Sequence, residues 1–490
     1  MGLRGGGCVW VMLWSVAVAF AGSTADSHTI SSSRLPVTTS SALARKHFEK
    51  GIEALEYLRR AEAVEDLRTA VTADPNFAQA LILISHLSQD PAEQQETRTR
   101  AQRLAPRVSA SEQLLIRWLG GVQEDNYLPA IAAMNDLLVR YPRDKRLLFL
   151  AGRWLVHQER YDQGIVILER AVALDADYPA ALNELGYAYA FSGDFEKGIA
   201  AMERYVELEP NQPNPHDSYG EILRLGGRFD AALEQYRLSI RADPNFGSEL
   251  GIADTLALMG KEAEAREEYE RAIVLVSSES ERVEYELQEA VTWIRENNRK
   301  QAEHALKDVG KHAHSARLGV LEAESHRYLA MYEPDYKAAM KQLQAAQDCL
   351  EGSHEISRSD RKDEQARILR VRAERAAESE DGDAAAAAVK ELLEMTQNSR
   401  SQVVQVSYHA AAGGVLLAQG KAGEAIPHLE EDASNPESLR RLWKAYTVTG
   451  AQTEARSVAG RLAELNIPTV EQALVVPPFR ESLVSKAGQP

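Results

Sequence analysis

The sequence predicts an all-α protein built as a solenoid of about ten to twelve antiparallel helix pairs. Two observations predict this fold class. Aromatic and apolar residues recur every 34 residues over the central part of the chain. Alanine, glutamate and leucine abound while aromatics make up only 7% of the residues, a composition that suits helices better than strands. A chain of 490 residues is also too long for one globular core, so a repeat array accounts for its size.

The 34-residue period is visible as several columns of residues that stay in phase. The aromatic column is Tyr127, Tyr161, Phe195 and Phe229; the leucine column is Leu114, Leu148 and Leu182; the glycine column is Gly152, Gly186 and Gly220; and Pro210 and Pro244 form a proline column. Apolar positions within each unit are three and four apart, which places one apolar stripe on each of two helices. We expect the glycine to let the two helices approach closely, the aromatic to open the second helix, and the proline to end it.

These columns carry a resemblance to a known family. Leu182-x2-Leu185-Gly186-x2-Tyr189, followed by Gly198-x3-Met202 and Pro210, resembles the tetratricopeptide repeat signature, with Leu, Gly and Met where Trp, Ala and Phe are usual. The resemblance implies a right-handed superhelical solenoid in which the first helix of each pair lines a concave face. It also implies that first-helix side chains on that face contact a protein or peptide ligand.

The period divides the chain into regions of different regularity. We expect degenerate pairs over 44–110, a regular array of five units over 111–280, and degenerate helical pairs over 281–466. A polar stretch at 351–360 breaks the last of these and is a candidate loop or hinge. Pro468, Pro477 and Pro478 predict an extended C-terminal tail over 467–490.

The N-terminal residues differ from the rest. Arg4 precedes an apolar run from Cys8 to Ala21 that is too short to span a bilayer comfortably, and Ala19-Phe20-Ala21 supplies a signal-peptidase spacing. We therefore expect a signal peptide over 1–21, a Ser/Thr-rich linker over 22–43, and export to the periplasm or the extracellular space, without membrane insertion after cleavage. The alternative is an uncleaved anchor in the inner membrane.

Little in the chain points to catalysis. The net charge of −17 disfavours nucleic acid as a partner. No phosphate-binding loop, dinucleotide fingerprint or paired-cysteine zinc pattern occurs, so we expect no cofactor, no metal and no enzymatic activity. His304, His312 and His314 with Asp308 form a histidine cluster, for which a solvated helix end is the favoured interpretation over a metal site. Cys349 lies on an apolar helical stripe, which indicates packing rather than a reactive thiol.

A concave binding groove is the functional hypothesis. Mapping the first-helix faces of three units predicts that it is lined by Arg146, Phe149, Arg153, His157, Asn183, Tyr187, Phe191, Asp217, Glu221 and Arg224. Arginines can grip carboxylates and aromatics offer contact area at low entropic cost, which suits a peptide segment or helix. The sequence thus predicts a non-catalytic scaffold or adaptor. The alternatives are a regulatory or sensor subunit of an envelope signalling system, with the 351–360 break as a hinge, and an enzyme with its site in 281–466.

Overall fold

The computed structural model describes residues 34–353 and 356–487, and within these ranges the regular structure is helical throughout. The first fourteen α-helices are α1 (Ala42–Glu56), α2 (Arg60–Ala73), α3 (Ala78–Leu87), α4 (Pro91–Leu104), α5 (Ala110–Gln123), α6 (Tyr127–Arg140), α7 (Lys145–His157), α8 (Tyr161–Leu174), α9 (Pro179–Phe191), α10 (Phe195–Leu208), α11 (Pro213–Leu225), α12 (Phe229–Ala242), α13 (Glu249–Leu258) and α14 (Glu262–Leu275). The remaining helices are α15 (Glu279–Arg295), α16 (Arg299–Ser315), α17 (Gly319–Tyr332), α18 (Tyr336–Gly352), α19 (Arg358–Glu378), α20 (Gly382–Asn398), α21 (Gln402–Ala418), α22 (Ala422–Glu430), α23 (Pro436–Thr449), α24 (Gln452–Ala463) and α25 (Val470–Ala487).

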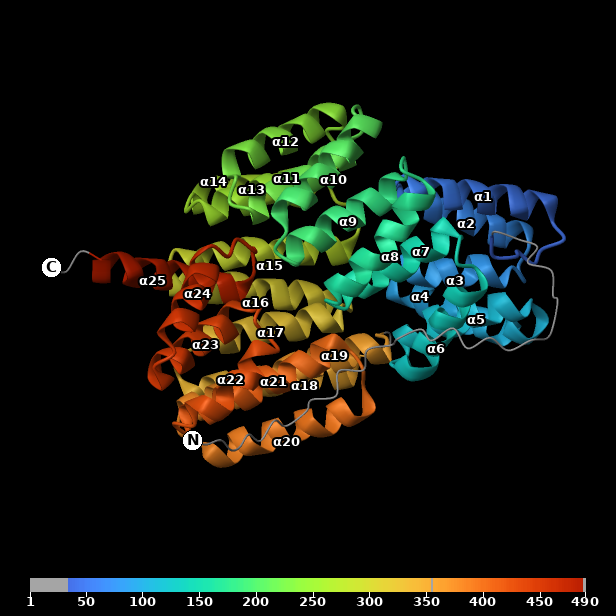
Figure 1. Ribbon diagram of the computed structural model, residues 1–490. Coiled ribbons are helices and arrows are strands. Elements are labelled where there is room, and N and C mark those ends of the chain that lie inside the picture. The colour runs from blue at the N-terminus through green and yellow to red at the C-terminus, as the bar shows by residue number, and fades with distance from the viewer. Residues whose placement is uncertain (1–33, 354–355, 488–490) are drawn as a thin grey trace, which may run out of the picture. The chain divides into compact units, whose positions relative to one another are not determined.

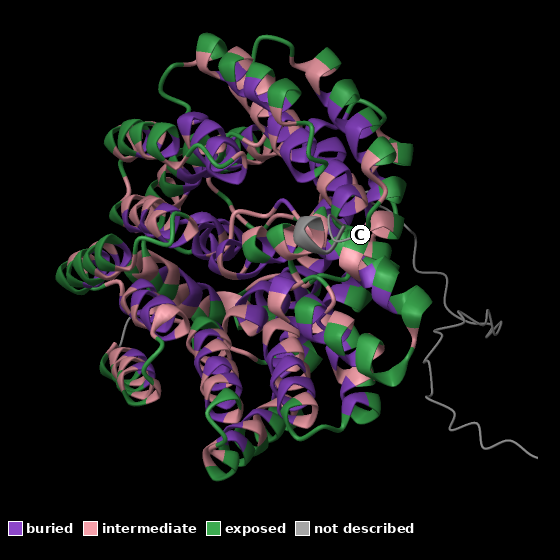
Figure 2. Ribbon diagram, turned by 90° about the vertical axis from the view of Figure 1, so that its left-hand side faces the viewer, coloured by how far each residue is buried: buried purple, intermediate pink, exposed green. Residues whose placement is uncertain are grey.

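Consecutive helices pack as antiparallel pairs, from α1 with α2 to α23 with α24, and α25 follows the last pair (Figure 1). Buried residues gather where helices face each other, while the outer sides are exposed (Figure 2). This arrangement confirms the predicted all-α solenoid of helix pairs. The five pairs from α5 to α14 coincide with the regular array expected over 111–280.

The turn inside each regular pair has the same backbone conformation. Positive φ angles occur at Asp125 (56°), Glu159 (56°), Gly193 (92°) and Gly227 (73°), which are 34 residues apart. The chain leaves the first helix at these residues, and the next helix begins two residues later at the predicted aromatic. Gly193 and Gly227 adopt this conformation without steric cost, whereas Asp125 and Glu159 do so against the preference of side-chain-bearing residues.

The glycine column is explained by close helix contact, as the sequence predicts. A Cβ atom on Gly152 would lie 2.5 Å from Leu168 Cγ on the paired helix, and one on Gly186 would lie 2.7 Å from Met202 Cε. Leu168 and Met202 are completely buried. The missing side chain in the first helix therefore makes room for a large one in the second.

The predicted extended tail over 467–490 is wrong for its described part, because Val470–Ala487 forms α25. Pro477 and Pro478 lie inside this helix at a cost to its hydrogen bonding. Its apolar residues are nevertheless buried: Val470 packs in a cluster with α15, while Val476 and Phe479 pack in another with α23. This burial offsets the cost of the prolines, which the sequence pattern alone does not show.

The predicted break over 351–360 is shorter than expected. Helix α18 continues to Gly352 and α19 begins at Arg358, so most of the polar stretch is helical. The Ser357 hydroxyl accepts a hydrogen bond from the Asp360 N–H and starts α19 as its N-cap. At the other end of the chain, the predicted signal peptide over 1–21 lies outside the described residues.

The solenoid also contacts itself between repeats that are distant in sequence. The turn between α5 and α6 meets α19: the Ser399 hydroxyl donates to Asp125 Oδ1 at 2.7 Å, and Lys362 forms an ion pair with the same carboxylate. The Tyr127 hydroxyl lies 2.9 Å from Ser359 Oγ in a buried hydrogen bond. These contacts join residues more than 230 positions apart, and the repeat pattern does not predict them.

Candidate peptide-binding groove

The ten predicted groove residues lie on α7, α9 and α11, the first helices of three consecutive pairs. Their spacing of three and four within each helix places them along one face. Two contacts join the helices across this face. Arg153 Nε on α7 lies 3.3 Å from Glu184 Oε1 on α9, and the Tyr187 hydroxyl donates to Glu221 Oε2 on α11 at 2.6 Å. We use the name groove face for the accessible part of this surface: Arg153, His157, Tyr187, Phe191, Asp217 and Glu221.

An aromatic stack occupies the middle of the groove face. The Phe191 ring lies 5.5 Å from the Tyr161 ring and 6.1 Å from the Tyr187 ring, with interplanar angles of 29° and 21°. Phe191 is 41% exposed, so this stack offers apolar area to a ligand. Sequence reasoning used Tyr161 only as a marker of the repeat. Its position two residues after the turn of its pair could have placed it beside the end of the next first helix.

Arg224 lies at the far end of the predicted set and is buried, so it does not present its side chain to a ligand. Its guanidinium donates to Glu221 Oε1 and to Asp254 Oδ2, each at 3.0 Å. The Tyr269 hydroxyl donates to the other oxygen of Asp254 at 2.6 Å. Arg224 therefore anchors Glu221 from behind. The sequence analysis missed Asp254, because this residue has no motif and becomes relevant only through α13 packing beside α11.

Arg146, Phe149 and Asn183 also fall outside the accessible groove face. Helix α1 comes against α7, and Arg146 forms ion pairs with Glu56 and Glu49 of α1. The Phe149 ring is buried against Tyr178, and the Asn183 side chain is buried in α9. The twist of the array thus covers the start of the predicted groove with the chain's own first helix.

Residues 34–41 lie in an extended conformation against the first helices of the N-terminal repeats. The Leu35 N–H donates to Asp144 Oδ2 at 2.9 Å, and the Thr38 N–H donates to Glu112 Oε1 at 2.7 Å. Leu35 and Val37 line an apolar cavity of about 100 Å³ between α1, α3, α5 and α7. This part of the predicted linker is therefore packed on the repeats, with main-chain groups held by carboxylates at helix starts.

Water is partly excluded from the groove face, which shifts the pKa values of its titratable groups. Desolvation and the charge of Arg153 lower the pKa of His157 to about 4, so this imidazole is neutral at pH 7. Desolvation raises the pKa of Asp217 to about 7, opposed by the hydrogen bond from Ser248. Burial likewise raises the pKa of Glu184, and the charge of Arg153 opposes this. Polar contacts made by a ligand here would be strengthened by the same exclusion of water.

The predicted histidine cluster does not converge on one point. His304 pairs with Asp308, whereas His312 lies between Glu286 and Glu279 at 2.8 and 3.0 Å. The hydrogen bond to Glu286 is the main cause of a raised pKa for His312. His314 instead approaches Glu322 on α17. These histidines belong to separate ion pairs, as a solvated helix would have them.

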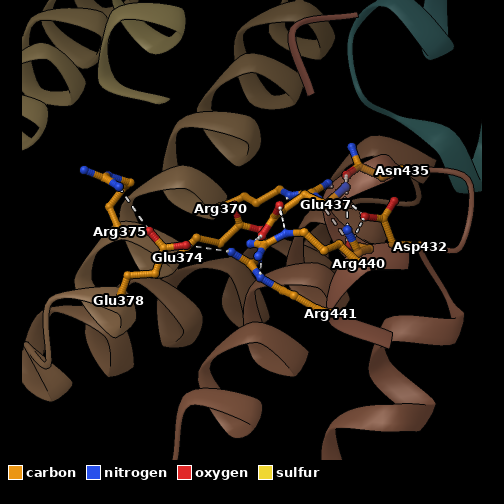
Figure 3. Close-up of polar contacts among 10 residues, drawn as sticks. Arg370, Glu374, Arg375, Glu378, Asp432, Asn435, Glu437, Arg440 and Arg441 are labelled. Carbon is orange, nitrogen blue, oxygen red and sulfur yellow. Dashed lines mark hydrogen bonds and ion pairs between the residues drawn. The ribbon is translucent and has the colours of Figure 1, made fainter. Parts of the chain in front are cut away.

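A polar network within 281–466 lies where an enzyme site was considered (Figure 3). Arg370 pairs with Asp432 at 2.9 Å, and Arg441 pairs with Glu374 at 2.6 Å and with Glu437 at 2.9 Å. Although burial opposes it, the charges of Arg441 and Arg370 hold the pKa of Glu374 below its usual range. Guanidinium groups stay protonated, so the network is a set of ion pairs that ties α19 to α23.

The comparisons with known proteins bear on the repeat. Residues 155–222, from the end of α7 into α11, match the family described as tetratricopeptide repeat. The chain is therefore a tetratricopeptide repeat protein, as the columns around Leu182 and Gly186 predict. No curated protein matches the sequence. No helix within the described residues is long and apolar enough to cross a membrane.

Several solved structures are similar to this chain at low identity. The Cut9–Hcn1 hetero-tetramer of the APC/C has 16% identity and a TM-score of 0.43, covering 88% of this chain and 78% of that one. A MamA structure has 21% identity and a TM-score of 0.29, covering 34% and 95%. TTC0263, a thermophilic tetratricopeptide repeat protein of Thermus thermophilus, has 18% identity and a TM-score of 0.29, covering 44% and 98%. At these values the likeness contributes nothing to assigning a function.

Proposed function

We propose that this protein is a non-catalytic scaffold that binds an extended polypeptide segment along the groove face. The tetratricopeptide repeat supports protein–protein interaction in general. The groove face offers what a peptide ligand requires: an exposed aromatic stack at Phe191, a cation at Arg153 and carboxylates at Asp217 and Glu221. Aromatic and arginine side chains are the groups that most often dominate binding energy at such surfaces.

The observation that carries this proposal is the position of residues 34–41. This segment is extended, its Leu35 and Thr38 main-chain N–H groups donate to carboxylates of the repeats, and its apolar side chains enter a cavity between first helices. The chain thus contains its own example of a peptide held by a surface of first helices. The groove face continues that row of helices with exposed side chains of the same kinds.

The test is a peptide-binding measurement with the full chain. A library of ten-residue peptides is screened against the wild-type protein, and the dissociation constant of the best peptide is then measured by fluorescence polarisation. Tyr187→Ala and Arg153→Glu are each expected to weaken binding by at least about 10-fold, because they remove an aromatic contact and reverse a charge.

The matched control is Tyr189→Ala, which removes the same side chain from another face of α9. Tyr189 contacts Glu169 on α8 and Lys197 on α10 rather than the groove face. This variant should bind the peptide like wild type. Equal losses in Tyr187→Ala and Tyr189→Ala, or a drop in melting temperature that accounts for the loss, would refute the groove assignment.

We further propose that the protein is exported and acts in the periplasm or outside the cell. This rests on the pattern of residues 1–21, which lie outside the described part of the chain. N-terminal sequencing of the protein recovered from the periplasmic fraction should begin after Ala21 or Ala25. Recovery of an uncleaved chain in the membrane fraction would support the inner-membrane anchor instead.

A further inference from the structure

Three metal-ligating side chains meet between α17 and α18, apart from the groove face. A carboxylate oxygen of Glu322, a ring nitrogen of His326 and the Sγ atom of Cys349 all lie within 4.8 Å of one another. Glu322 and His326 are four residues apart on α17, so they share a helix face. Cys349 faces them from the antiparallel partner helix α18. All three side chains are half-buried.

The set suits a zinc ion in ligand type and in size. Thiolate, imidazole and carboxylate are the three groups that bind Zn²⁺ in proteins, and three of them leave one position for water or a fourth ligand. Tetrahedral ligands bound at about 2.0–2.3 Å lie about 3.3–3.8 Å apart. Side-chain rotations that bring the three atoms closer by about 1 Å would therefore complete the geometry.

The surroundings of His326 prepare it for metal binding. Its Nδ1 lies 2.7 Å from Gln342 Oε1 on α18. A carbonyl oxygen only accepts hydrogen bonds, so Nδ1 carries the proton and Nε2 keeps its lone pair. A hydrogen bond to the second ring nitrogen is the usual way in which proteins fix a metal-binding histidine.

A fourth ligand and a favourable charge are also present. His314 Nδ1, at the end of α16, lies 3.1 Å from both carboxylate oxygens of Glu322, and its side chain is 76% exposed and free to rotate. Among the described residues, Glu322 has this histidine as its ion-pair partner rather than a lysine or arginine. Asp348 adds a second negative charge near the thiol. A divalent cation would balance this charge.

We propose that Glu322, His326 and Cys349 bind one Zn²⁺ ion, with His314 or a water molecule as the fourth ligand. On binding, the thiol proton of Cys349 passes to water and a sulfur–zinc bond replaces the S–H bond. The ion would connect α17 to α18, and through His314 to α16. It would act as a structural link in the half of the array where the repeat is degenerate.

The test uses the full chain after removal of metals with a chelator. Titration with Zn²⁺ is expected to show one equivalent bound and a rise in melting temperature. Titration with Co²⁺ is expected to show the near-ultraviolet band of a thiolate–cobalt bond. Cys349→Ser should abolish that band and weaken Zn²⁺ binding by more than about 100-fold, because loss of an outer hydrogen bond alone costs about 10–100-fold. Gln342→Ala should weaken binding by about 10-fold.

The controls separate this site from other metal-binding groups. Cys8→Ser makes the same substitution at the other cysteine, and His304→Gln and His312→Gln alter histidines outside the cluster; all three should bind like wild type. If Cys349→Ser fails to fold, Glu322→Gln replaces it with a side chain of the same shape and should also lose binding. Absence of Zn²⁺ binding by wild type, or binding that survives in Cys349→Ser and Glu322→Gln, overturns the proposal.

Discussion

The regular pairs over 111–280 and the degenerate pairs over 281–466 are held together in different ways. In the regular half, a glycine in one helix faces a large side chain in the other, as Gly186 faces Met202, and the first helices have 10–14 residues. In the degenerate half, first helices reach 17–21 residues in α15, α19 and α21. Buried ion pairs such as Arg327 with Glu364 join neighbouring first helices there.

The difference teaches why the period is visible in one half and drifts in the other. Steric fit requires a small residue at one fixed point on each helix, so the columns repeat at 34. An arginine is long and reaches a carboxylate from several offsets. The pairs of Arg327 with Glu364 and of Arg441 with Glu374 span 37 and 67 residues. Ion pairs can therefore preserve the helix stack while the sequence period is lost.

The largest effect is expected from breaking a buried pair in the degenerate half. Glu364→Ala leaves the Arg327 guanidinium, itself 5% exposed, without its main partner. We expect the free energy of unfolding to fall by about 3–5 kcal/mol, measured by urea denaturation. The double variant Arg327→Met/Glu364→Leu removes both charges and should recover most of this loss. An equally large loss in the double variant would show that packing, rather than charge, joins these helices.

A somewhat smaller effect is expected from disturbing the steric fit of the regular half. Gly186→Leu forces its side chain against Met202 and should lower the free energy of unfolding by at least about 1–3 kcal/mol through overpacking. Gly460→Leu on α24 is the matched control, because a Cβ atom there meets open space. The control should be neutral or slightly stabilising, since leucine favours helix. Equal behaviour of the two variants would contradict the role assigned to the glycine column.

The smallest effect concerns charge within the regular half and depends on pH. The pKa of Asp217 is raised to about 7 by desolvation, so the native state holds a proton that the unfolded state releases near pH 4. Wild-type stability therefore falls as the pH rises from about 4 to 7. Asp217→Asn lacks this titration and should exceed wild type by about 1 kcal/mol or more at pH 8, with little difference at pH 4. Parallel stability profiles for the two proteins would refute the raised pKa.

The sequence could predict the fold because the columns are steric. Tyr127, Tyr161, Phe195 and Phe229 each begin a second helix, and Gly152 and Gly186 lie where the helices approach most closely. It could not predict α25, because prolines at 477 and 478 argue against a helix and only packing against α15 and α23 outweighs them.

The groove could be predicted only in part. The spacing identified the correct face of α7, α9 and α11, and Arg153, Tyr187, Phe191 and Glu221 lie on it within contact of one another. The exposure of each residue depends on neighbours that are distant in sequence. Arg146 meets α1 and Arg224 meets Asp254, so these side chains serve the fold. A helix-face map contains no information about such neighbours.

The contact between the α5–α6 turn and α19 has a consequence for how this protein can evolve. Asp125 receives hydrogen bonds from Lys362 and Ser399, and Tyr127 meets Ser359. In an open array each repeat touches only its neighbours, so units can be duplicated or lost with little penalty. Here, a unit gained or deleted between residues 128 and 358 would move one side of this contact away from the other. The number of repeats in that interval is therefore under structural selection, and the array has a counted length.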